Sequence, residues 1–519
     1  MWNDRIEQVK QNRLRRAQGG GEAKIRQQHQ NEKLTAPERI EFLLDEGSFI
    51  EINGMREPDE SSSSFRKSQS APGDGVYTGW GTIDGRRVCV VAEDFTVVGG
   101  TLGVVHAQKI THLQDLALEM RVPIIFLNDS GGARIEEGIN ALSGYGEIFQ
   151  RHVRASGIIP QICAILGPCC GGASYSPALC DFIFVVRDIS RMFITGPDVV
   201  EAALGTRPSF EELGGASMHS TTSGVAHALY NDERSCLRGI RKLLSYLPSS
   251  CDTLPPELPG PDVLRGHEQR LSFENIVPDI KRKAYDMHQV IDNLMDQDAP
   301  LFEIQKHFAN NVITGFSYLN RQVTGVVANQ PLRQGGALDC NASDKIARFV
   351  RFCDCFRIPL LTLVDVPAFL PGIDQEQKGI IRHGAKILYA YSEATVPKIS
   401  VILRKAYGGA YIAMNSKTMS ADIVYAWPIA EIAVMGAAGA VKVLYKKQLS
   451  AAADPQREAE RLEQSYEESF LNTDIAEKKG FIDEVILPEE TRSRLITGFS
   501  FLAGKDRGIS GRKHGNIPL

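Results

Sequence analysis

Two short turns of the same composition are the residues in this chain best suited to chemistry. Gly171-Gly172-Ala173 and Gly408-Gly409-Ala410 each follow a run of apolar residues and each open a helical stretch. The first N–H groups of a helix have no partner inside the helix, and the helix dipole favours negative charge there. Glycine lets a ligand oxygen come close to those donors. The turns therefore predict two oxyanion holes, in which N–H groups stabilise charge that develops on a carbonyl oxygen.

An internal duplication accounts for the presence of two turns. Val90-Val91-Ala92 matches Val326-Val327-Ala328 when the sequence is compared with itself at one constant offset. The other matches at this offset include Gly99-Gly100 with Gly335-Gly336, Lys109-Ile110 with Lys345-Ile346, and Asp129 with Asp365. The Gly-Gly-Ala turns match after one residue of slippage. Tight packing of a helix on a strand would better explain one isolated turn, but its recurrence in both repeats favours the oxyanion hole.

Each repeat contains the same expected elements in the same order. A β-branched strand leads through a Gly-Gly loop into a helix, a second strand ends in Asp, and a third strand runs into the Gly-Gly-Ala turn. These strands are expected at 88–92, 123–127 and 162–166 in the first repeat, and at 323–328, 359–364 and 399–403 in the second. Short apolar runs that alternate with helical stretches are typical of α/β folds with largely parallel strands.

A Pro-rich stretch lies between the two repeats, at residues 254–261. Proline-rich segments of this kind are typical of connections between folded regions. The sequence therefore predicts two domains, one of residues 1–255 and one of residues 256–519.

A second glycine-rich loop, Ser130-Gly131-Gly132-Ala133-Arg134, follows the second strand of the first repeat. It combines backbone donors with one fixed cation, so it would suit a phosphate or pyrophosphate group of a substrate. Two oxyanion holes imply two carbonyls to polarise. One could belong to a thioester whose enolate must be stabilised, and the other to a second reactant.

The composition argues against several classes of protein. Hydrophobic residues at 43% and charged residues at 23% are typical of globular proteins, and a net charge of -5 gives no reason to expect a nucleic-acid partner. No apolar stretch approaches the roughly 20 residues of a membrane-spanning helix. The 10 cysteines lack Cys-x-x-Cys spacing, which favours a reducing cytoplasmic compartment over a zinc ribbon. We expect no metal in this chain.

Motifs that would supply a protein nucleophile are also missing. The sequence has no Gly-x-Ser-x-Gly, no P-loop, no Rossmann fingerprint and no His-Glu-x-x-His. Chemistry that relies on backbone donors, with the reacting groups supplied by substrate and cofactor, fits this inventory.

Several long motifs occur along the chain in a fixed order. They are Asp129-Ser-Gly-Gly-Ala-Arg134, Gly167-Pro-Cys-Cys-Gly-Gly-Ala173, Asn341-Ala-Ser-Asp-Lys345, Gly379-Ile-Ile-Arg-His-Gly-Ala-Lys386 and Arg404-Lys-Ala-Tyr-Gly-Gly-Ala410. With these motifs the chain resembles the β subunit of propionyl-CoA carboxylase and its relatives, which include methylmalonyl-CoA decarboxylase and transcarboxylase subunits. The resemblance extends from Gly19 to Leu519, nearly the whole chain.

The resemblance implies a fold and an assembly. The fold would be two tandem crotonase-like domains of the ClpP/crotonase ββα-superhelix type. The assembly would be a homohexamer built as a dimer of trimers, in which the N-terminal domain of one subunit and the C-terminal domain of another share an active site.

The resemblance also implies the activity of a carboxyltransferase subunit in a biotin-dependent acyl-CoA carboxylase. A carboxyl group would move between carboxybiotin and the α-carbon of a short-chain acyl-CoA such as propionyl-CoA, through an enolate. The chain contains neither a biotin-accepting Ala-Met-Lys-Met nor an ATP-grasp pattern. Biotin is therefore expected on a separate biotin carboxylase or biotin carboxyl carrier subunit.

The resemblance assigns roles to residues of both repeats. The N–H groups of Gly171 and Gly172 would hold the thioester oxygen on the acyl-CoA side, and those of Gly409 and Ala410 the ureido oxygen of biotin. The remaining assignments are contact with biotin for Tyr407 and Gly408, and contact with acyl-CoA for Gly131, Gly132, Ala133, Arg134 and Ile412. Ile412 stands where dedicated propionyl-CoA carboxylases have aspartate, so a wider tolerance of acyl-chain length is expected.

Other functions stay open at this point. The nearest is the carboxyltransferase subunit of methylmalonyl-CoA decarboxylase or transcarboxylase, which runs the reverse half-reaction. A biotin-independent crotonase-type enzyme needs only one crotonase unit, so the duplication counts against it. A non-catalytic scaffold subunit has no need of two oxyanion holes, so their retention counts against that function.

Overall fold

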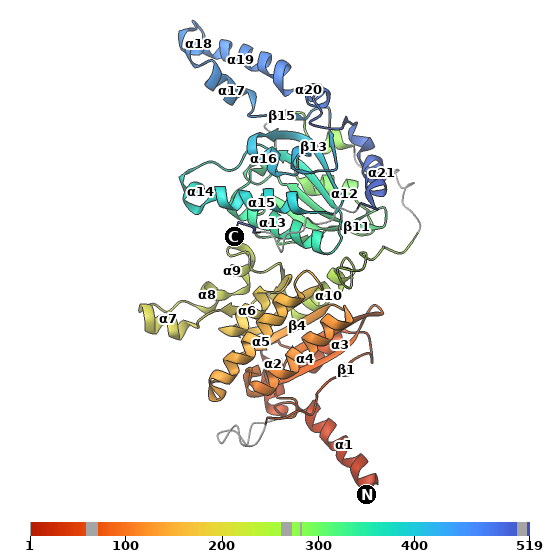
Figure 1. The fold of residues 1–519 in the computed structure, drawn as a ribbon. Helices are drawn as coiled ribbons and strands as arrows, with labels where there is room; N and C mark the ends of the chain where they lie inside the picture. The colour runs from red at the N-terminus through yellow and green to blue at the C-terminus, as the bar shows by residue number, and fades with distance from the viewer. Residues whose placement is uncertain (1, 59–70, 261–271, 281–282, 506–515, 519) are drawn as a thin grey trace. The chain divides into compact units, whose positions relative to one another are not determined.

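The computed structural model describes residues 2–58, 71–260, 272–280, 283–505 and 516–518. The chain forms two compact units, Met1–Leu254 and Pro255–Leu519, called unit 1 and unit 2 below (Figure 1). Each unit is built on an 8-stranded sheet of its own.

The sheet of unit 1 has the strand order β1-β2-β3-β4-β5-β6-β8, and the short β7 pairs with β5. Its strands are β1 (Ile50–Glu51), β2 (Val76–Ile83), β3 (Arg86–Glu93), β4 (Ile124–Ser130), β5 (Gln161–Cys170), β6 (Phe182–Val186), β7 (Arg191–Phe193) and β8 (Ala228–Tyr230). β1, β2 and β3 pair in antiparallel fashion, whereas the pairs from β3 to β8 are parallel. The β2–β3 hairpin closes at Asp84-Gly85, which have φ values of 50° and 76°, as a two-residue type I′ turn requires.

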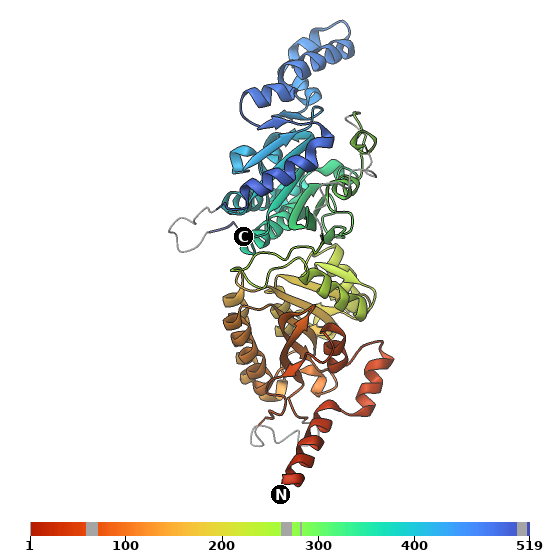
Figure 2. The same cartoon turned by 90° about the vertical axis from the view of Figure 1, so that its right-hand side faces the viewer.

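Helices cover both faces of this sheet. The helical elements of unit 1 are α1 (Trp2–Ala17), α2 (Glu22–Gln30), α3 (Ala36–Leu43), α4 (Val104–Met120), α5 (Ile139–Ala155), α6 (Gly172–Ala178), α7 (Pro197–Leu204), α8 (Phe210–Gly214), α9 (Ala216–Thr221) and α10 (Glu233–Leu244), with short 3-10 turns η2 (Val98–Gly100) and η3 (Ile135–Glu137). Of these, α1 and α7 are largely exposed and project away from the sheet. Strand side chains such as Val91 and Phe126 form a core with Ile110 of α4 and Ile148 of α5. α3 packs against α10, which contacts β5, β6 and β8. Figure 2 shows α5 and α10 on opposite sides of the sheet.

Unit 2 repeats this architecture, with the strand order β16-β14-β13-β12-β11-β10-β9 and β15 paired to β13. Its strands are β9 (Phe302–Ile304), β10 (Val312–Leu319), β11 (Gln322–Asn329), β12 (Leu360–Val366), β13 (Lys398–Tyr407), β14 (Ile423–Ala426), β15 (Glu431–Ala433) and β16 (Glu484–Val485). β9, β10 and β11 are antiparallel, and the pairs from β11 onward are parallel. The β10–β11 hairpin closes at Asn320 and Arg321, which have φ values of 50° and 68°.

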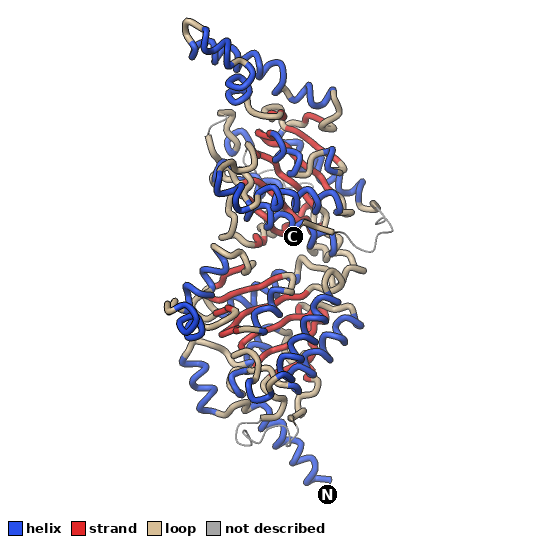
Figure 3. The backbone as a smooth tube through the Cα atoms, turned by 60° about the vertical axis from the view of Figure 1, so that its left-hand side comes forward, coloured by secondary structure: helices blue, strands red, loops and turns tan. Residues whose placement is uncertain are grey.

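The helices of unit 2 include a group that follows β15 and extends away from the sheet (Figure 3). The helical elements are α11 (Phe273–Ile276), α12 (Met287–Leu294), η4 (Gln334–Gly336), α13 (Cys340–Cys355), α14 (Ile373–Lys378), α15 (Ile380–Glu393), α16 (Gly408–Ala413), η5 (Lys417–Met419), α17 (Ala437–Leu444), α18 (Lys446–Ala451), α19 (Pro455–Tyr466), η6 (Glu467–Leu471), α20 (Thr473–Lys478), η7 (Pro488–Glu490) and α21 (Thr491–Leu502). α12 and α21 share one buried core with β11, β12 and β13. The extended group is α17 to α20.

The two sheets confirm the α/β fold class and the predicted repeat. The six strands expected from the sequence correspond to β3, β4 and β5 in unit 1 and to β11, β12 and β13 in unit 2. β2 and β10, the first strands of the two hairpins, are not among the strands expected from the sequence. None of the described helices is long and apolar enough to cross a membrane.

Candidate active site

The first Gly-Gly-Ala turn joins β5 to α6 in unit 1. Gly171 has a φ of 59°, in the left-handed region that glycine adopts readily. Its N–H donates to the carbonyl of Phe193 on β7 at 3.0 Å. Gly172 and Ala173 are the first residues of α6, and no residue in the described part of the chain accepts from their N–H groups. Two adjacent unpaired donors of this kind suit an oxyanion hole.

This geometry changes the assignment of donors in unit 1. Gly171 and Gly172 are the donors expected from the sequence, but the N–H of Gly171 already donates to the carbonyl of Phe193 on β7. Gly171 corresponds to Gly408 of unit 2, since both have a φ of 59°. Gly172 and Ala173 are therefore the counterparts of Gly409 and Ala410, and Ala173 takes the place of Gly171 as the second donor of the first turn.

The second turn joins β13 to α16 in unit 2. Across the described ranges, no acceptor meets the N–H groups of Gly409 and Ala410. Tyr407, the residue before the turn, donates its hydroxyl to the carboxylate of Glu431 on β15. Burial and this carboxylate raise the pKa of Tyr407 above its ordinary value, so the phenol stays protonated and holds the turn against β15. The expected contact of Tyr407 and Gly408 with biotin stays a prediction.

The structure brings the loop 131–134 beside the first turn. A Cβ placed on Gly132 would lie 2.9 Å from the carbonyl oxygen of Cys170. The N–H groups of Gly131 and Gly132 already donate to protein oxygens, at 2.9 and 3.2 Å. Within the described residues, the N–H of Ala133 has no acceptor. Of this loop, Ala133 is therefore the residue best placed to contact a substrate through its backbone.

Arg134 fastens the loop to its surroundings. Its side chain is only 5% exposed, and its Nη1 lies 2.8 Å from a carboxylate oxygen of Asp74 and 2.7 Å from one of Glu137. Its Nη2 donates to the carbonyl of Thr101 at 2.9 Å. Because protein groups already occupy the guanidinium, we do not retain the expected contact of Arg134 with a substrate phosphate.

A buried cluster of charges, which the sequence analysis missed, anchors the end of β4. The carboxylate of Asp129 lies 2.7 Å from Lys33 and 3.0 Å from Arg39. Arg39 also pairs with Glu233 at 2.7 Å. A Cβ placed on Gly167 would lie 1.9 Å from Oδ1 of Asp129, so the cluster fills the space that a side chain on β5 would need. It fixes the point at which β4 enters the loop 131–134.

Unit 2 holds the matching aspartate differently. Arg404, which occupies the position of Gly167 on the equivalent strand, lies 3.1 Å from Asp365. Its guanidinium also donates to the carbonyl of Lys283 at 2.8 Å and lies 4.9 Å from the ring of Tyr285. Burial raises the pKa of Asp365 despite the opposing effect of Arg404. The buried aspartate thus recurs in both units, while the cation comes from the adjacent strand in unit 2 and from the N-terminal segment in unit 1.

Ile412 lies on α16, the short helix that the second turn opens. Its side chain is 41% exposed, so it is accessible to a ligand that approaches the turn. Its role in the choice of acyl chain stays a prediction.

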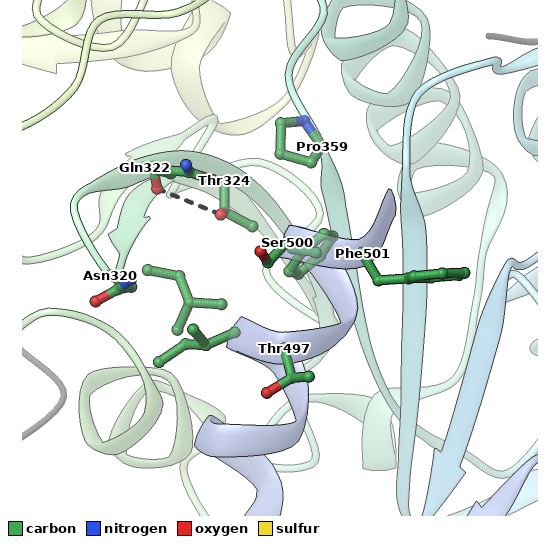
Figure 4. Close-up of a pocket in the computed structure, with 10 residues that line it drawn as sticks. Asn320, Gln322, Thr324, Pro359, Thr497, Ser500 and Phe501 are labelled. Carbon is green, nitrogen blue, oxygen red and sulfur yellow. Dashed lines mark hydrogen bonds between the residues drawn. The ribbon is translucent and has the colours of Figure 1, made fainter. Parts of the chain in front are cut away.

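A surface pocket of unit 2 lies away from the second turn. This cavity of about 520 Å³ is lined by residues of the β10–β11 hairpin and of α21, and by Pro359, which precedes β12 (Figure 4). It therefore lies at the amino ends of the parallel strands, whereas the turn follows the carboxyl end of β13. Open α/β sheets bind ligands at the carboxyl ends, so we do not assign this pocket to the active site. In the described part of the chain, no group of three or more His, Cys, Asp or Glu side chains could hold a metal ion.

Comparison with known proteins identifies the family to which this site belongs. The carboxyl transferase domain family matches residues 27–517, nearly the whole chain. The chain therefore belongs to the carboxyl transferase family.

The nearer relatives define the group within this family. The chain is 52% identical over 517 residues to a propionyl-CoA carboxylase carboxyltransferase subunit from Haloferax mediterranei, with 99% of each chain covered. It is 48% identical over 515 residues to methylmalonyl-CoA decarboxylase subunit alpha from Propionigenium modestum, again with 99% of each covered. These similarities confirm the resemblance to the propionyl-CoA carboxylase β-subunit family, and the chain is an acyl-CoA carboxyltransferase.

A solved structure supports the same conclusion for the fold. The chain is similar to transcarboxylase 12S, in a structure with methylmalonyl-coenzyme A and methylmalonic acid bound. The two are 45% identical, with a TM-score of 0.95 over 100% of this chain and 99% of that chain. This likeness confirms the expected pair of tandem crotonase-like domains.

Proposed function

We propose that this chain is the carboxyltransferase subunit of a biotin-dependent acyl-CoA carboxylase, with a short-chain acyl-CoA such as propionyl-CoA as its substrate. The observation that carries the proposal is the presence of the same turn in both units, each with two adjacent unpaired N–H groups. Transfer of a carboxyl group between two carbonyl compounds can use one such turn to stabilise the oxygen of each.

Each unit would serve one reactant. The N-terminal domain, proposed as residues 1–255, would take the acyl-CoA, with Gly172 and Ala173 donating to the thioester oxygen. The C-terminal domain, proposed as residues 256–519, would take biotin, with Gly409 and Ala410 donating to the ureido oxygen. The second turn suits biotin because a ureido carbonyl oxygen is an acceptor that two adjacent N–H groups can hold.

The protein would contribute orientation and electrostatic stabilisation. Carboxybiotin, when bound, supplies the carboxyl group and the base for the α-proton. Gly172 and Ala173 would stabilise the negative charge that grows on the thioester oxygen as that proton leaves. Both turns are fastened to neighbouring strands, the first through Gly171 to β7 and the second through Tyr407 to β15, so their donors need little rearrangement during the reaction.

The proposed assembly is a homohexamer, a dimer of trimers, that works with a biotin carboxylase or biotin carboxyl carrier subunit. Transcarboxylase 12S forms a hexamer assembly. In this chain α7 and α17 each expose two apolar side chains, Val199 and Leu204 at 56% and 74% and Val443 and Leu444 at 67% and 63%, as expected of apolar surface that other copies cover. We propose that unit 1 of one copy and unit 2 of another form each active site. The free state of all ten cysteines supports a cytoplasmic location.

The reverse half-reaction is the second candidate. The decarboxylase subunit from Propionigenium modestum is 48% identical to this chain, close to the 52% of the carboxylase subunit. Both functions use the same turns, and the biotin-bearing partner would decide the direction.

The proposal is tested by measuring decarboxylation of methylmalonyl-CoA by the purified chain, with and without free biotin. We expect loss of the carboxyl group only when biotin is present. Turnover without biotin would instead indicate a biotin-independent crotonase-type decarboxylase. If free biotin gives no turnover, a biotinylated carrier protein is supplied, and failure with that carrier would indicate a scaffold subunit.

A further inference from the structure

An aromatic ring lies against the middle residue of the glycine turn in each unit. In unit 1 a Cβ placed on Gly172 would lie 2.8 Å from Cδ2 of Tyr145. In unit 2 a Cβ placed on Gly409 would lie 4.0 Å from Cε2 of Phe369. The two rings therefore occupy similar places next to residues that the proposed function treats as donors.

The two rings come from different elements. Tyr145 belongs to helix α5, whereas Phe369 belongs to the loop that follows β12. The position equivalent to Phe369 in unit 1 is Ala133, because Leu102 forms an isolated parallel bridge with Ala133 as Leu338 does with Phe369. A small residue thus stands in the loop of unit 1 where unit 2 has a large one.

The helices α5 and α15 differ in the opposite sense, with the large residue in unit 1 and the small one in unit 2. α5 buries Ala141, Tyr145, Ile148 and His152, and α15 buries Ile380, Gly384, Ile387 and Tyr391 with the same spacing. Gly384 is therefore the counterpart of Tyr145. A Cβ placed on Gly384 would lie 3.1 Å from the ring of Phe369, so the ring in unit 2 uses space that a helix side chain would otherwise fill.

Tyr145 supports the turn through the packing of its ring and not through its hydroxyl. Tyr145 is 4% exposed, and its hydroxyl lies near Ser130 but forms no hydrogen bond of ordinary geometry with the described residues. The side chain also lines a cavity of about 10 Å³ together with Ala173 and Glu93. Tyr145 therefore packs against Gly172 and lines the same cavity as Ala173.

We propose that Tyr145 and Phe369 are positioning residues, each holding the N–H groups of its turn toward the oxygen of one reactant. This inference rests on the proposed function of the turns. Protein interiors are close-packed, so removal of the buried ring of Tyr145 would leave its turn above a void into which it can shift. Removal of the half-buried ring of Phe369 would take away a packing contact of the second turn. A misplacement of about 1 Å in a catalytic arrangement can lower the rate by roughly 100-fold.

The test measures biotin-dependent decarboxylation of methylmalonyl-CoA by hexameric Tyr145→Ala and Phe369→Ala variants. Tyr145→Ala is expected to lower kcat/KM for methylmalonyl-CoA by roughly 100-fold and to leave KM for free biotin unchanged. Phe369→Ala is expected to lower kcat/KM for free biotin and to leave KM for methylmalonyl-CoA unchanged. A purely structural role would not separate the two reactants in this way.

Three further variants serve as controls. Phe149→Ala removes a ring whose centroid lies 5.8 Å from that of Tyr145 on the same helix, and it should leave both reactants unaffected. Tyr145→Phe keeps the ring and should keep the wild-type kinetics. Tyr145→Gly combined with Ala133→Phe transfers the arrangement of unit 2 into unit 1, and it should recover most of the activity lost in Tyr145→Ala.

The outcomes separate this inference from the function on which it rests. Wild-type kinetics in both alanine variants, or equal losses for both reactants, would overturn the positioning roles while the wild type stayed active with biotin. If Tyr145→Ala does not fold, failure of the double variant to recover activity in a folded hexamer would overturn the role of Tyr145. A wild type that shows no turnover with biotinylated carrier would overturn the proposed function itself, and the inference with it.

Discussion

At the scale of single residues, two buried lysines stand at matching positions of the two repeats. Nζ of Lys109 donates to the carbonyl of Gly73 at 2.9 Å, and Nζ of Lys345 donates to that of Gln305, also at 2.9 Å. Within the described residues, neither lysine forms an ion pair with a carboxylate. Burial lowers the pKa of Lys109 to about 7 and that of Lys345 to about 8. Each lysine therefore binds backbone carbonyls of the segment that leads into β2 or β10. This contact has an electrostatic cost, because the ammonium group is buried.

This cost predicts how stability depends on pH. Between pH 7 and about 10.4, the ordinary lysine value, the unfolded chain binds a proton at Lys109 that the folded chain does not. The contribution of Lys109 to the free energy of unfolding should therefore rise with pH. Urea titrations of the wild type and of Lys109→Met at pH 7 and pH 9 should show their difference shifting in favour of the wild type, by up to about 3 kcal/mol.

Lys10→Met is the control, because Lys10 is 66% exposed. Its difference from the wild type should stay constant over the same range. A constant difference for Lys109→Met as well would show that Lys109 keeps an ordinary pKa in the folded chain.

Ile412 carries a second prediction at this scale. Its side chain is 41% exposed on α16, so an aspartate there would stay hydrated and need not unfold the helix. Ile412→Asp should narrow acceptance toward propionyl-CoA, with the rates for acetyl-CoA and butyryl-CoA falling about tenfold relative to it, a change of roughly 1.4 kcal/mol. Carboxylation rates for the three substrates check this. Unchanged ratios would show that Ile412 does not contact the acyl chain.

At the scale of elements, the parallel strands could be predicted because each is a short β-branched run next to a helical pattern. β2 was not identified, although Asp84-Gly85 is a strong hairpin signal. The hairpin signal before β11 is weaker, because Asn320-Arg321 contains no glycine although both residues have a positive φ. The charged cluster at Asp129 could not be predicted, because its cations come from segments almost a hundred positions away in the chain.

The cluster at Asp129 predicts a large effect of a single substitution. Arg39→Met would leave the carboxylates of Asp129 and Glu233 buried without their shared cation. Removing one partner of a buried pair costs about 3–5 kcal/mol, so the free energy of unfolding should fall by that amount in a urea titration. The loss should be accompanied by lower activity, since the cluster anchors the strand that leads to the loop 131–134.

A surface pair provides the comparison for this variant. Arg207 and Asp198 lie 2.7 Å apart, with their side chains 63% and 82% exposed. Arg207→Ala should change the free energy of unfolding by less than about 0.5 kcal/mol. If Arg39→Met had as small an effect, the cluster would not be what anchors β4.

At the scale of the whole molecule, the duplication was visible in the sequence because both copies keep the glycine turns and the strand-end aspartates. The unpaired N–H groups could not be predicted from the sequence. The N–H of Gly171 is occupied only because β7 pairs with the end of β5, a contact with no local sequence signal. The exchange of Tyr145 and Ala133 for Gly384 and Phe369 was equally hidden, because it joins positions in separate elements.

The central claim, that backbone donors of the two turns perform the chemistry, is tested most directly by Gly409→Pro. Proline removes the N–H at the second residue of α16, a position where a helix tolerates it. Loss of one oxyanion donor costs roughly 100- to 1,000-fold in kcat, so biotin-dependent decarboxylation of methylmalonyl-CoA should fall by that factor while the hexamer stays intact. Ala438→Pro places proline at the second residue of α17 and should leave the rate unchanged. Full activity of Gly409→Pro in an intact hexamer would contradict the account.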